Sequence, residues 1–192
     1  FTGIELGTSS AYNGTKISAS ELAFKPTDTL HLKMINDDML FFQETLKRSS
    51  KRVFVSDNKL EKIYSTNIKV AVEKSNSEVS SIKIRKVSEG RNKTKATENA
   101  TGIDYKYEEV QNTLQLNGFF LSHLSYRFSD EVVYATIYIP ENSTVFLDKT
   151  TQSFLYNIAT IDRMYDEDMV GHYFKMTDKG LDCTDCIEEP II

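Results

Sequence analysis

Apolar and polar residues alternate along several stretches of this chain, and the clearest of these stretches lie between residues 103 and 147. In the longest run, residues 132–139, every second residue is aliphatic: Val133, Ala135, Ile137 and Ile139. Alternation with a period of two is typical of β-strands, because successive side chains point to opposite faces of a sheet. Pro140 follows this run directly. A proline cannot donate a backbone hydrogen bond, so it fits the end of a strand.

The same alternation predicts further strands, and one stretch departs from it. Strands are expected around residues 30–34, 53–55, 68–73, 82–85, 103–108, 114–116, 119–121 and 145–147. Ala96, Ala100 and Ile103 are instead spaced by four and three residues, which places them on one face of a helix. We therefore predict one short helix near residues 93–103, whose small alanines would allow it to pack closely on a sheet.

The predicted elements indicate an all-β fold with a single core. Short strands are expected to stack as a β-helix or β-roll, with one short helix. A two-sheet β-sandwich is the alternative, because the strand spacing lacks the clean period of most solenoids. A chain of 192 residues is long enough for one substantial core. Residues 1–20, rich in Gly, Ser and Thr, are predicted to be an irregular leader or tether with at most one edge strand. Residues 21–192 are predicted to form a single β-rich domain.

Charge and hydropathy narrow the classes of partner. The net charge of −5 argues against a broad nucleic-acid surface, which needs a positive face. A local basic group surrounds Ser49 and Ser50 but has no aromatic residues interleaved to stack on bases, so a solvated loop is the favoured interpretation; its members are Lys47, Arg48, Lys51 and Arg52. No stretch approaches the ~20 apolar residues of a membrane helix, so no direct membrane insertion by this chain is expected.

Cys183 and Cys186 form the one C-x-x-C sequence, and three interpretations compete for it. A metal site would need two more ligands, and the nearest histidine, His172, is isolated in the sequence. A redox pair of the thioredoxin type needs a stabilised thiolate, whereas Asp182 and Asp185 would raise the pKa of the thiols. A local disulfide, or unpaired structural thiols, is the favoured interpretation.

The chain carries no recognised catalytic motif. It lacks a nucleophile elbow, an H-E-x-x-H sequence, a P-loop and a dinucleotide fingerprint. A group of aspartates in the tail does not follow the ligand series of an EF-hand loop. The sequence therefore predicts no catalytic residue, no metal and no cofactor. The residues considered and set aside are the scattered histidines His31, His123 and His172, and the acidic-turn residues Asp162, Asp166 and Asp168.

A family resemblance rests on the order of segments within residues 68–155 and 168–186. These segments resemble the extracytoplasmic C-terminal toast-rack domain of phage shock protein C (PspC) domain proteins from Bacteroides-type bacteria. One departure lies before the long strand, where residues 126–131 keep Arg127 but then turn acidic. The segments that carry the resemblance include Ser81-Ile82-Lys83-Ile84, Ser88-Glu89-Gly90, Ile103-Asp104-Tyr105, Leu114-Gln115-Leu116-Asn117, Leu147-Asp148-Lys149 and Lys175-Met176-Thr177-Asp178-Lys179-Gly180.

The resemblance implies a membrane-anchored parent with a PspC domain, several membrane helices, and this domain projecting across the inner membrane. The implied localisation is periplasmic or extracytoplasmic. The implied role is a non-enzymatic sensor or scaffold in envelope-stress signalling, with another envelope protein or a second copy of itself as partner. A chain that opens with Phe1 and has no methionine before Met34 is expected to be a piece of such a longer protein.

Two other functions remain open. A surface adhesin or glycan-binding module is suggested by Tyr134 and Tyr138, which share one face of the long strand. Aromatic faces stack on sugars but also pack in cores, so burial of both rings would defeat this reading. A hydrolase built on a right-handed β-helix is the third possibility, and it would need converging carboxylates in a groove.

Overall fold

The structure is a computed structural model that describes residues 12–35, 52–57, 60–123 and 130–187, with the backbone alone described for residues 52–57, 60 and 61. Most of the described chain is extended. The elements, in chain order, are β1 (Tyr12–Glu21), β2 (Thr29–Ile35), β3 (Arg52–Asp57), β4 (Leu60–Ser65), β5 (Ile68–Lys74), β6 (Ser81–Gly90), α2 (Lys93–Thr101), β7 (Tyr107–Val110), β8 (Thr113–Asn117), β9 (Phe120–His123), β10 (Val132–Ile139), β11 (Thr144–Leu147), η2 (Lys149–Thr151), η3 (Asp166–Asp168), β12 (Tyr173–Thr177) and β13 (Gly180–Cys183).

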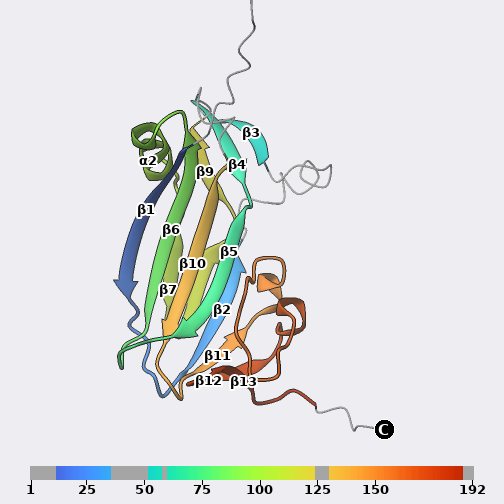
Figure 1. Ribbon diagram of the computed structural model, residues 1–192. Helices are drawn as coiled ribbons and strands as arrows, with labels where there is room; N and C mark the ends of the chain where they lie inside the picture. Colours follow the sequence, from blue (N-terminus) through green and yellow to red (C-terminus); the bar gives the residue numbers. More distant parts are fainter. Residues whose placement is uncertain (1–11, 36–51, 58–59, 124–129, 188–192) are drawn as a thin grey trace, which may run out of the picture.

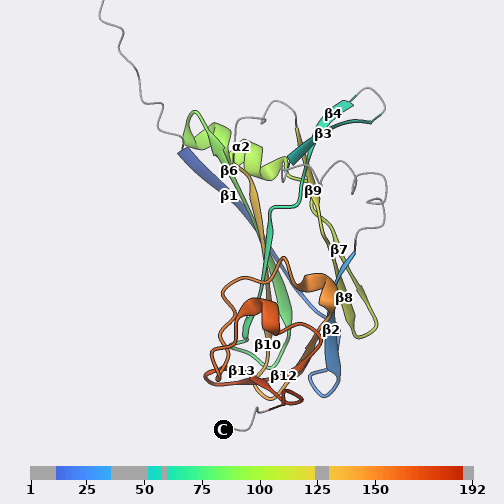
Figure 2. The ribbon, with the colours of Figure 1, turned by 90° about the vertical axis from the view of Figure 1, so that its right-hand side faces the viewer.

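Three sheets contain these strands. Sheet A has the order β1-β6-β10-β5, sheet B the order β13-β12-β11-β2-β8-β7, and sheet C the order β3-β4-β9. The strands of sheet A lie side by side toward the viewer in Figure 1, and the turned view shows β2, β7 and β8 of sheet B in a second layer behind them (Figure 2). Helix α2 lies at the end of the molecule that carries β3 and β4, and β12 and β13 lie at the opposite end.

The chain visits the sheets in a repeated order. It runs from sheet B through sheet C to sheet A over β2 to β5, and again over β8 to β10, before β11 returns to sheet B. Stacking these two passes pairs β2 in parallel with β8 and β11, and β5 in parallel with β10. Parallel neighbours need crossover connections rather than hairpins, and the second pass supplies them. The prediction of an all-β toast-rack fold with one short helix is confirmed.

The core lies between sheets A and B and is formed by the apolar residues of the alternating stretches. Strand β10 buries every second side chain, and β2 and β8 do the same on the other side. Side chains from both layers join one continuous hydrophobic cluster. Its fully buried members include Leu30, Leu32, Ile82, Leu114, Leu116, Ile137 and Ile139.

Helix α2, at the site of the predicted helix, packs directly on the backbone of sheet A. Asn92 caps its N-terminus by accepting a hydrogen bond from the Lys95 amide at 2.8 Å. Ala96 and Ala100 are fully buried. A Cβ atom added at Gly14 of β1 would lie 2.2 Å from the backbone of Ala96, and one at Gly90 of β6 would lie 2.4 Å from it. The small residues on both sides therefore set the distance between helix and sheet.

A lysine supports the C-terminal end of this helix. The Lys86 ammonium donates a hydrogen bond of 2.7 Å to the carbonyl of Ile103, just beyond the helix. A cation near a helix C-terminus interacts favourably with the helix dipole. Burial lowers the pKa of Lys86, while the Asp104 carboxylate acts in the opposite direction. The helix is thus held at its end as well as through its alanine face.

One of the two predicted segments with irregular features agrees with the structure in part and the other differs from it. Residues 1–20 are predicted to contain at most one edge strand, and residues 12–20 belong to the edge strand β1, which pairs with β6 along its whole length; residues 1–11 lie outside the described residues. The strand predicted from residue 103 begins only at Tyr107, because residues 103–106 pair at a single bridge between Asp104 and Leu121. Ile103 and Tyr105 are nevertheless buried, so the alternation in this segment indicates burial of side chains and not strand pairing.

Replacing Tyr105 by phenylalanine is expected to raise the free energy of unfolding by about 1 kcal/mol. The Tyr105 hydroxyl is buried and has no hydrogen-bond partner among the described residues, and burial raises the pKa of this phenol above its ordinary value. A buried polar group without a partner keeps its desolvation penalty in the folded state. Urea unfolding of Tyr105→Phe beside Tyr107→Phe, a half-buried neighbour, measures the effect. A fall in stability that is specific to Tyr105→Phe would contradict this account.

Candidate functional site

The outer edge of β1 is the longest open strand edge among the described residues. Strand β1 has ten residues, pairs with β6 on one side only, and is exposed at every position except Gly14. Ile17, at its centre, is 54% exposed. An unpaired strand edge presents free backbone N–H and C=O groups, which can pair with a strand of another chain. Proteins commonly blunt such edges with charge or proline, and here Lys16 is the one central charged residue.

Two other sheet edges are closed by residues 154–161. At the β5 edge of sheet A, the Val70 amide donates to the Phe154 carbonyl at 2.8 Å and the Tyr156 amide donates to the Val70 carbonyl at 2.9 Å. At the β13 edge of sheet B, the Leu181 amide donates to the Ala159 carbonyl at 2.9 Å. Strand β7, at the other edge of sheet B, has only four residues. The described residues thus cover or shorten these edges, and none of them pairs with the outer edge of β1.

The outward face of sheet A carries a row of side chains that begins at β1. Ile17 is the register partner of Arg85 in β6, Arg85 of Tyr134 in β10, and Tyr134 of Lys69 in β5. The Arg85 guanidinium lies 4.1 Å from the centre of the Tyr134 ring. The Lys69 ammonium lies 4.3 Å from the ring centre of Tyr156. These distances are within the range of cation–π interactions.

Tyr134 and Tyr138 are both half-buried and lie on the outward face, not in the core. Both rings have a cation over one face, since Lys83 lies 5.3 Å from the centre of Tyr138. The condition that would have defeated a sugar platform, burial of both rings, is therefore not met. Beside this row, a hollow of about 270 Å³ lies between residues 66–69 and 153–156.

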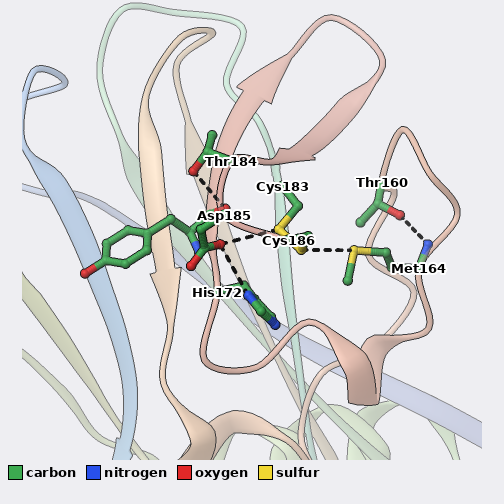
Figure 3. Close-up of a disulfide and its surroundings, with 8 residues drawn as sticks. Thr160, Met164, His172, Cys183, Thr184, Asp185 and Cys186 are labelled. Carbon is green, nitrogen blue, oxygen red and sulfur yellow. Dashed lines mark hydrogen bonds and ion pairs between the residues drawn. A yellow bond between two sulfur atoms is a disulfide. The ribbon is translucent and has the colours of Figure 1, made fainter. Parts of the chain in front are cut away.

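A second group of chemically reactive side chains lies at the β12–β13 hairpin. Cys183 and Cys186 are joined by a disulfide, and the Cα atoms are 5.6 Å apart. His172 Nδ1 lies 3.3 Å from the Asp185 carboxylate, and that carboxylate also accepts a hydrogen bond of 3.0 Å from the Tyr173 amide. Figure 3 shows His172, Asp185 and the cysteines pointing toward one another, with Met164 approaching from a separate loop. His172 is thus isolated in the sequence but not in the structure.

The other histidines and aspartates that were considered for chemistry either make structural contacts or lie exposed on the surface. The His31 ring packs on Phe146, with 5.4 Å between the centroids. The Asp166 carboxylate accepts hydrogen bonds from the amides of Asn157 and Ile158 at 3.0 and 3.2 Å, so it orders the tail. His123 lies exposed at the end of β9. Asp162 and Asp168 are exposed on the same tail.

Parts of two predicted features lie outside the described residues. These are Lys47, Arg48 and Lys51 of the basic group, together with residues 126–129 of the segment that departs from the resemblance. Of the latter segment, Glu131 is described and is buried. It accepts a hydrogen bond of 2.6 Å from the Ser122 hydroxyl. At this position the departure therefore supplies a structural contact to β9.

Sequence reasoning missed the pairing of His172 with Asp185, although a signal for it exists. Strands β12 and β13 form a hairpin in which Phe174 is the partner of Cys183 and Thr177 of Gly180. Extending that register by two residues places His172 opposite Asp185. The turn residues Asp178, Lys179 and Gly180 are typical of a hairpin, and once the hairpin is recognised the register follows.

Comparison with known proteins identifies one family. The sequence model of the ToastRack domain found in some PspC proteins matches residues 55–189, which is more than half of the chain. No curated protein and no solved structure shows a significant match. Among the described residues, no helix has the length and apolar character needed to cross a bilayer.

Proposed function

The chain belongs to the family of ToastRack domains found in some PspC proteins, and from this premise we propose that it is the extracytoplasmic sensor or scaffold domain of a membrane-anchored PspC-type protein. It acts by protein–protein contact in the response to envelope stress and performs no chemistry itself. The family is not an enzyme family, which supports the non-enzymatic part of this assignment. Residues that precede β1 would then connect the domain to the last membrane helix of the parent.

The open edge of β1 is the observation that supports contact with a protein. A partner strand laid against β1 would extend sheet A, with main-chain hydrogen bonds supplying affinity. Side chains of the outward row, beginning with Ile17 and Arg85, would lie beside the added strand and supply specificity. We assign the occupant to an extended segment of another envelope protein. A second copy of this chain is the other outcome that the experiment distinguishes.

In-cell crosslinking of the full-length, membrane-anchored parent, followed by mass spectrometry, tests this function. We expect at least one envelope protein to be captured in a yield that changes with envelope stress. The matched control is the same parent without residues 12–187, which should lose that capture while remaining in the membrane. Capture that persists in the control, or a yield that is insensitive to stress, would contradict the sensor or scaffold role. Crosslinks between copies of this domain alone would assign the edge to self-association.

Glycan binding is the second candidate, and the outward tyrosines favour it. Tyr134 and Tyr156 meet edge to face, with ring centres 6.3 Å apart, beside the hollow next to Lys69. An aromatic face can stack on a sugar ring. A sugar would have to displace Lys69 from Tyr156 and Arg85 from Tyr134, however, because these cations already lie over the rings.

Binding of the purified chain to cell-surface glycans tests this candidate. If the tyrosine row binds sugar, Tyr156→Ala, at a residue that is 39% exposed, should abolish binding. Tyr12→Ala, at a residue that is 51% exposed and lies at the start of β1, five positions before Ile17, should retain it. Absence of glycan binding by the chain without substitutions, or equal loss of binding in both variants, would exclude the tyrosine row as a sugar platform.

A further inference from the structure

Four side chains at the end of the β12–β13 hairpin place donor atoms of three kinds around one point. The ligand atoms of His172, Cys183, Asp185 and Cys186 all lie within 4.8 Å of one another. Cys186 Sγ is also 4.0 Å from Met164 Sδ (Figure 3). Within the described residues this is the one place where three or more such side chains converge. No step of the proposed function uses it.

The backbone holds these residues in place independently of the disulfide. The hairpin register sets His172 opposite Asp185, and the Thr184 amide continues the pairing with a hydrogen bond of 2.9 Å to the Tyr173 carbonyl. The Tyr173 amide fixes the Asp185 carboxylate. His172, Cys183 and Cys186 are partly buried, and Asp185 is exposed. Opening the disulfide would therefore leave both thiols beside an imidazole and a carboxylate that are already positioned.

This donor set matches the chemistry of zinc. Zn²⁺ takes thiolate, imidazole and carboxylate ligands in tetrahedral geometry, at about 2.0 to 2.3 Å from the metal, and two cysteines separated by two residues are a frequent half of such sites. Ligand atoms around such an ion are separated by less than about 4 Å. The four atoms already lie within 4.8 Å of one another, which is close to the spacing that such an ion requires. The hard carboxylate favours zinc over copper(I), which prefers soft ligands.

We propose that reduction of the Cys183–Cys186 disulfide converts this corner into a Zn²⁺ site formed by His172, Cys183, Asp185 and Cys186. A dithiol reductant supplies two electrons and two protons, the S–S bond breaks to give two thiols, and the dithiol leaves as its own disulfide. Zn²⁺ then displaces the two thiol protons, because a coordinated thiol is deprotonated. The assignment is independent of the sensor or scaffold role.

The two states would hold the same part of the fold in different ways. In the oxidised chain the disulfide closes a loop just after β13. In the reduced chain the ion would join that loop to His172, which directly precedes β12. Metal binding couples to folding because the site exists only when the hairpin is formed. Zinc would therefore add to the stability of the C-terminal hairpin once the disulfide is open.

Cobalt(II) titration of the whole chain tests the site, since Co²⁺ reports ligand type and geometry in its absorption spectrum. After reduction with a phosphine under anaerobic conditions, we expect one Co²⁺ per chain, thiolate charge-transfer absorption, and the visible bands of a tetrahedral ion. Zn²⁺ should displace the Co²⁺. The oxidised chain should show none of these signals. A reduced chain that gives no tetrahedral spectrum would overturn the assignment.

Ligand variants decide whether the site is the assembled cluster or the two thiols alone. His172→Ala and Asp185→Ala should each weaken Zn²⁺ affinity about tenfold or more, since even indirect partners of metal ligands commonly contribute that much. His123→Ala, on β9, and Met164→Leu should leave the affinity unchanged. Unchanged affinity in His172→Ala, or loss in Met164→Leu, would overturn the donor set. Circular dichroism of each oxidised variant checks that the fold is retained.

Discussion

Replacing Gly14 by valine is expected to lower the free energy of unfolding by about 2 to 3 kcal/mol. A Cβ atom at this position would lie 2.2 Å from the Ala96 carbonyl carbon and from the Thr97 amide nitrogen, both of which belong to the backbone of helix α2. Backbone atoms cannot rotate away as a side chain can. The helix would have to move off β1 and expose Ala96 and Ala100, which are now fully buried.

The matched control for Gly14 is Ser18→Val, in the same strand. Ser18 is exposed, so the substitution adds no clash, and its effect should stay within about 0.5 kcal/mol. Chemical denaturation of both variants gives the comparison. Gly90→Ala is a second test, because it meets the same helix from β6 at 2.4 Å. Equal stability of Gly14→Val and Ser18→Val would show that helix and sheet are not held at the contact described.

The second large effect is expected from Ile137→Ala, which should lower the free energy of unfolding by about 3 to 4 kcal/mol. Ile137 is fully buried in the middle of β10, between its register partners Ile82 in β6 and Val72 in β5. Truncation removes apolar contacts and leaves a cavity. Neighbours fixed in a central strand can fill that cavity only in part.

Thr136→Ala is the control for this prediction, since Thr136 lies on the opposite, outward face of the same strand. We expect a cost below about 1 kcal/mol there, because surface substitutions rarely have large effects. Urea unfolding of the two variants measures both losses. The midpoints can be compared directly if the dependence of the unfolding free energy on urea concentration is the same in both variants. A similar loss in both variants would mean that the two faces of β10 are not divided between core and solvent as described.

Several strands with one buried face could be predicted from the sequence, because burial of one face imposes a two-residue period. Strands β2, β5, β8 and β10 lie where the alternation predicted them. Helix α2 was likewise marked by its alanines, which must be small to approach Gly14 and Gly90. Each of these signals arises from contact with the core.

The predicted strands nevertheless omit β4, β12 and β13, although Ile63, Phe174 and Leu181 in these strands are fully buried. Strand β1 is exposed at every position except Gly14, so it shows no alternation, and its composition predicts no more than an edge strand. Residues 103–106 alternate because they are buried, yet their backbone follows the end of a helix and pairs at one bridge. The closure of two sheet edges by residues 154–161 depends on a few backbone hydrogen bonds that any residue can make.

The candidate functional residues also differ in how far the sequence predicts their positions. Tyr134 and Tyr138 could be placed on the outward face from the strand pattern alone. Their coverage by Arg85 and Lys83 could not, because it depends on the neighbour of β10 in the sheet. The convergence of His172 with the cysteines depends likewise on hairpin register, which the sequence specifies only after the turn between β12 and β13 is located.

Site-specific photo-crosslinking in cells tests most directly that the β1 edge is the surface through which this domain makes contact. A photoreactive residue is placed at Ile17 of the membrane-anchored parent and, as a matched control, at Ile161; these positions are 54% and 44% exposed. We predict that Ile17 captures an envelope protein in a yield that changes with envelope stress, and that Ile161 does not. Capture at Ile161 alone, equal capture at both positions, or none at Ile17 would contradict the account.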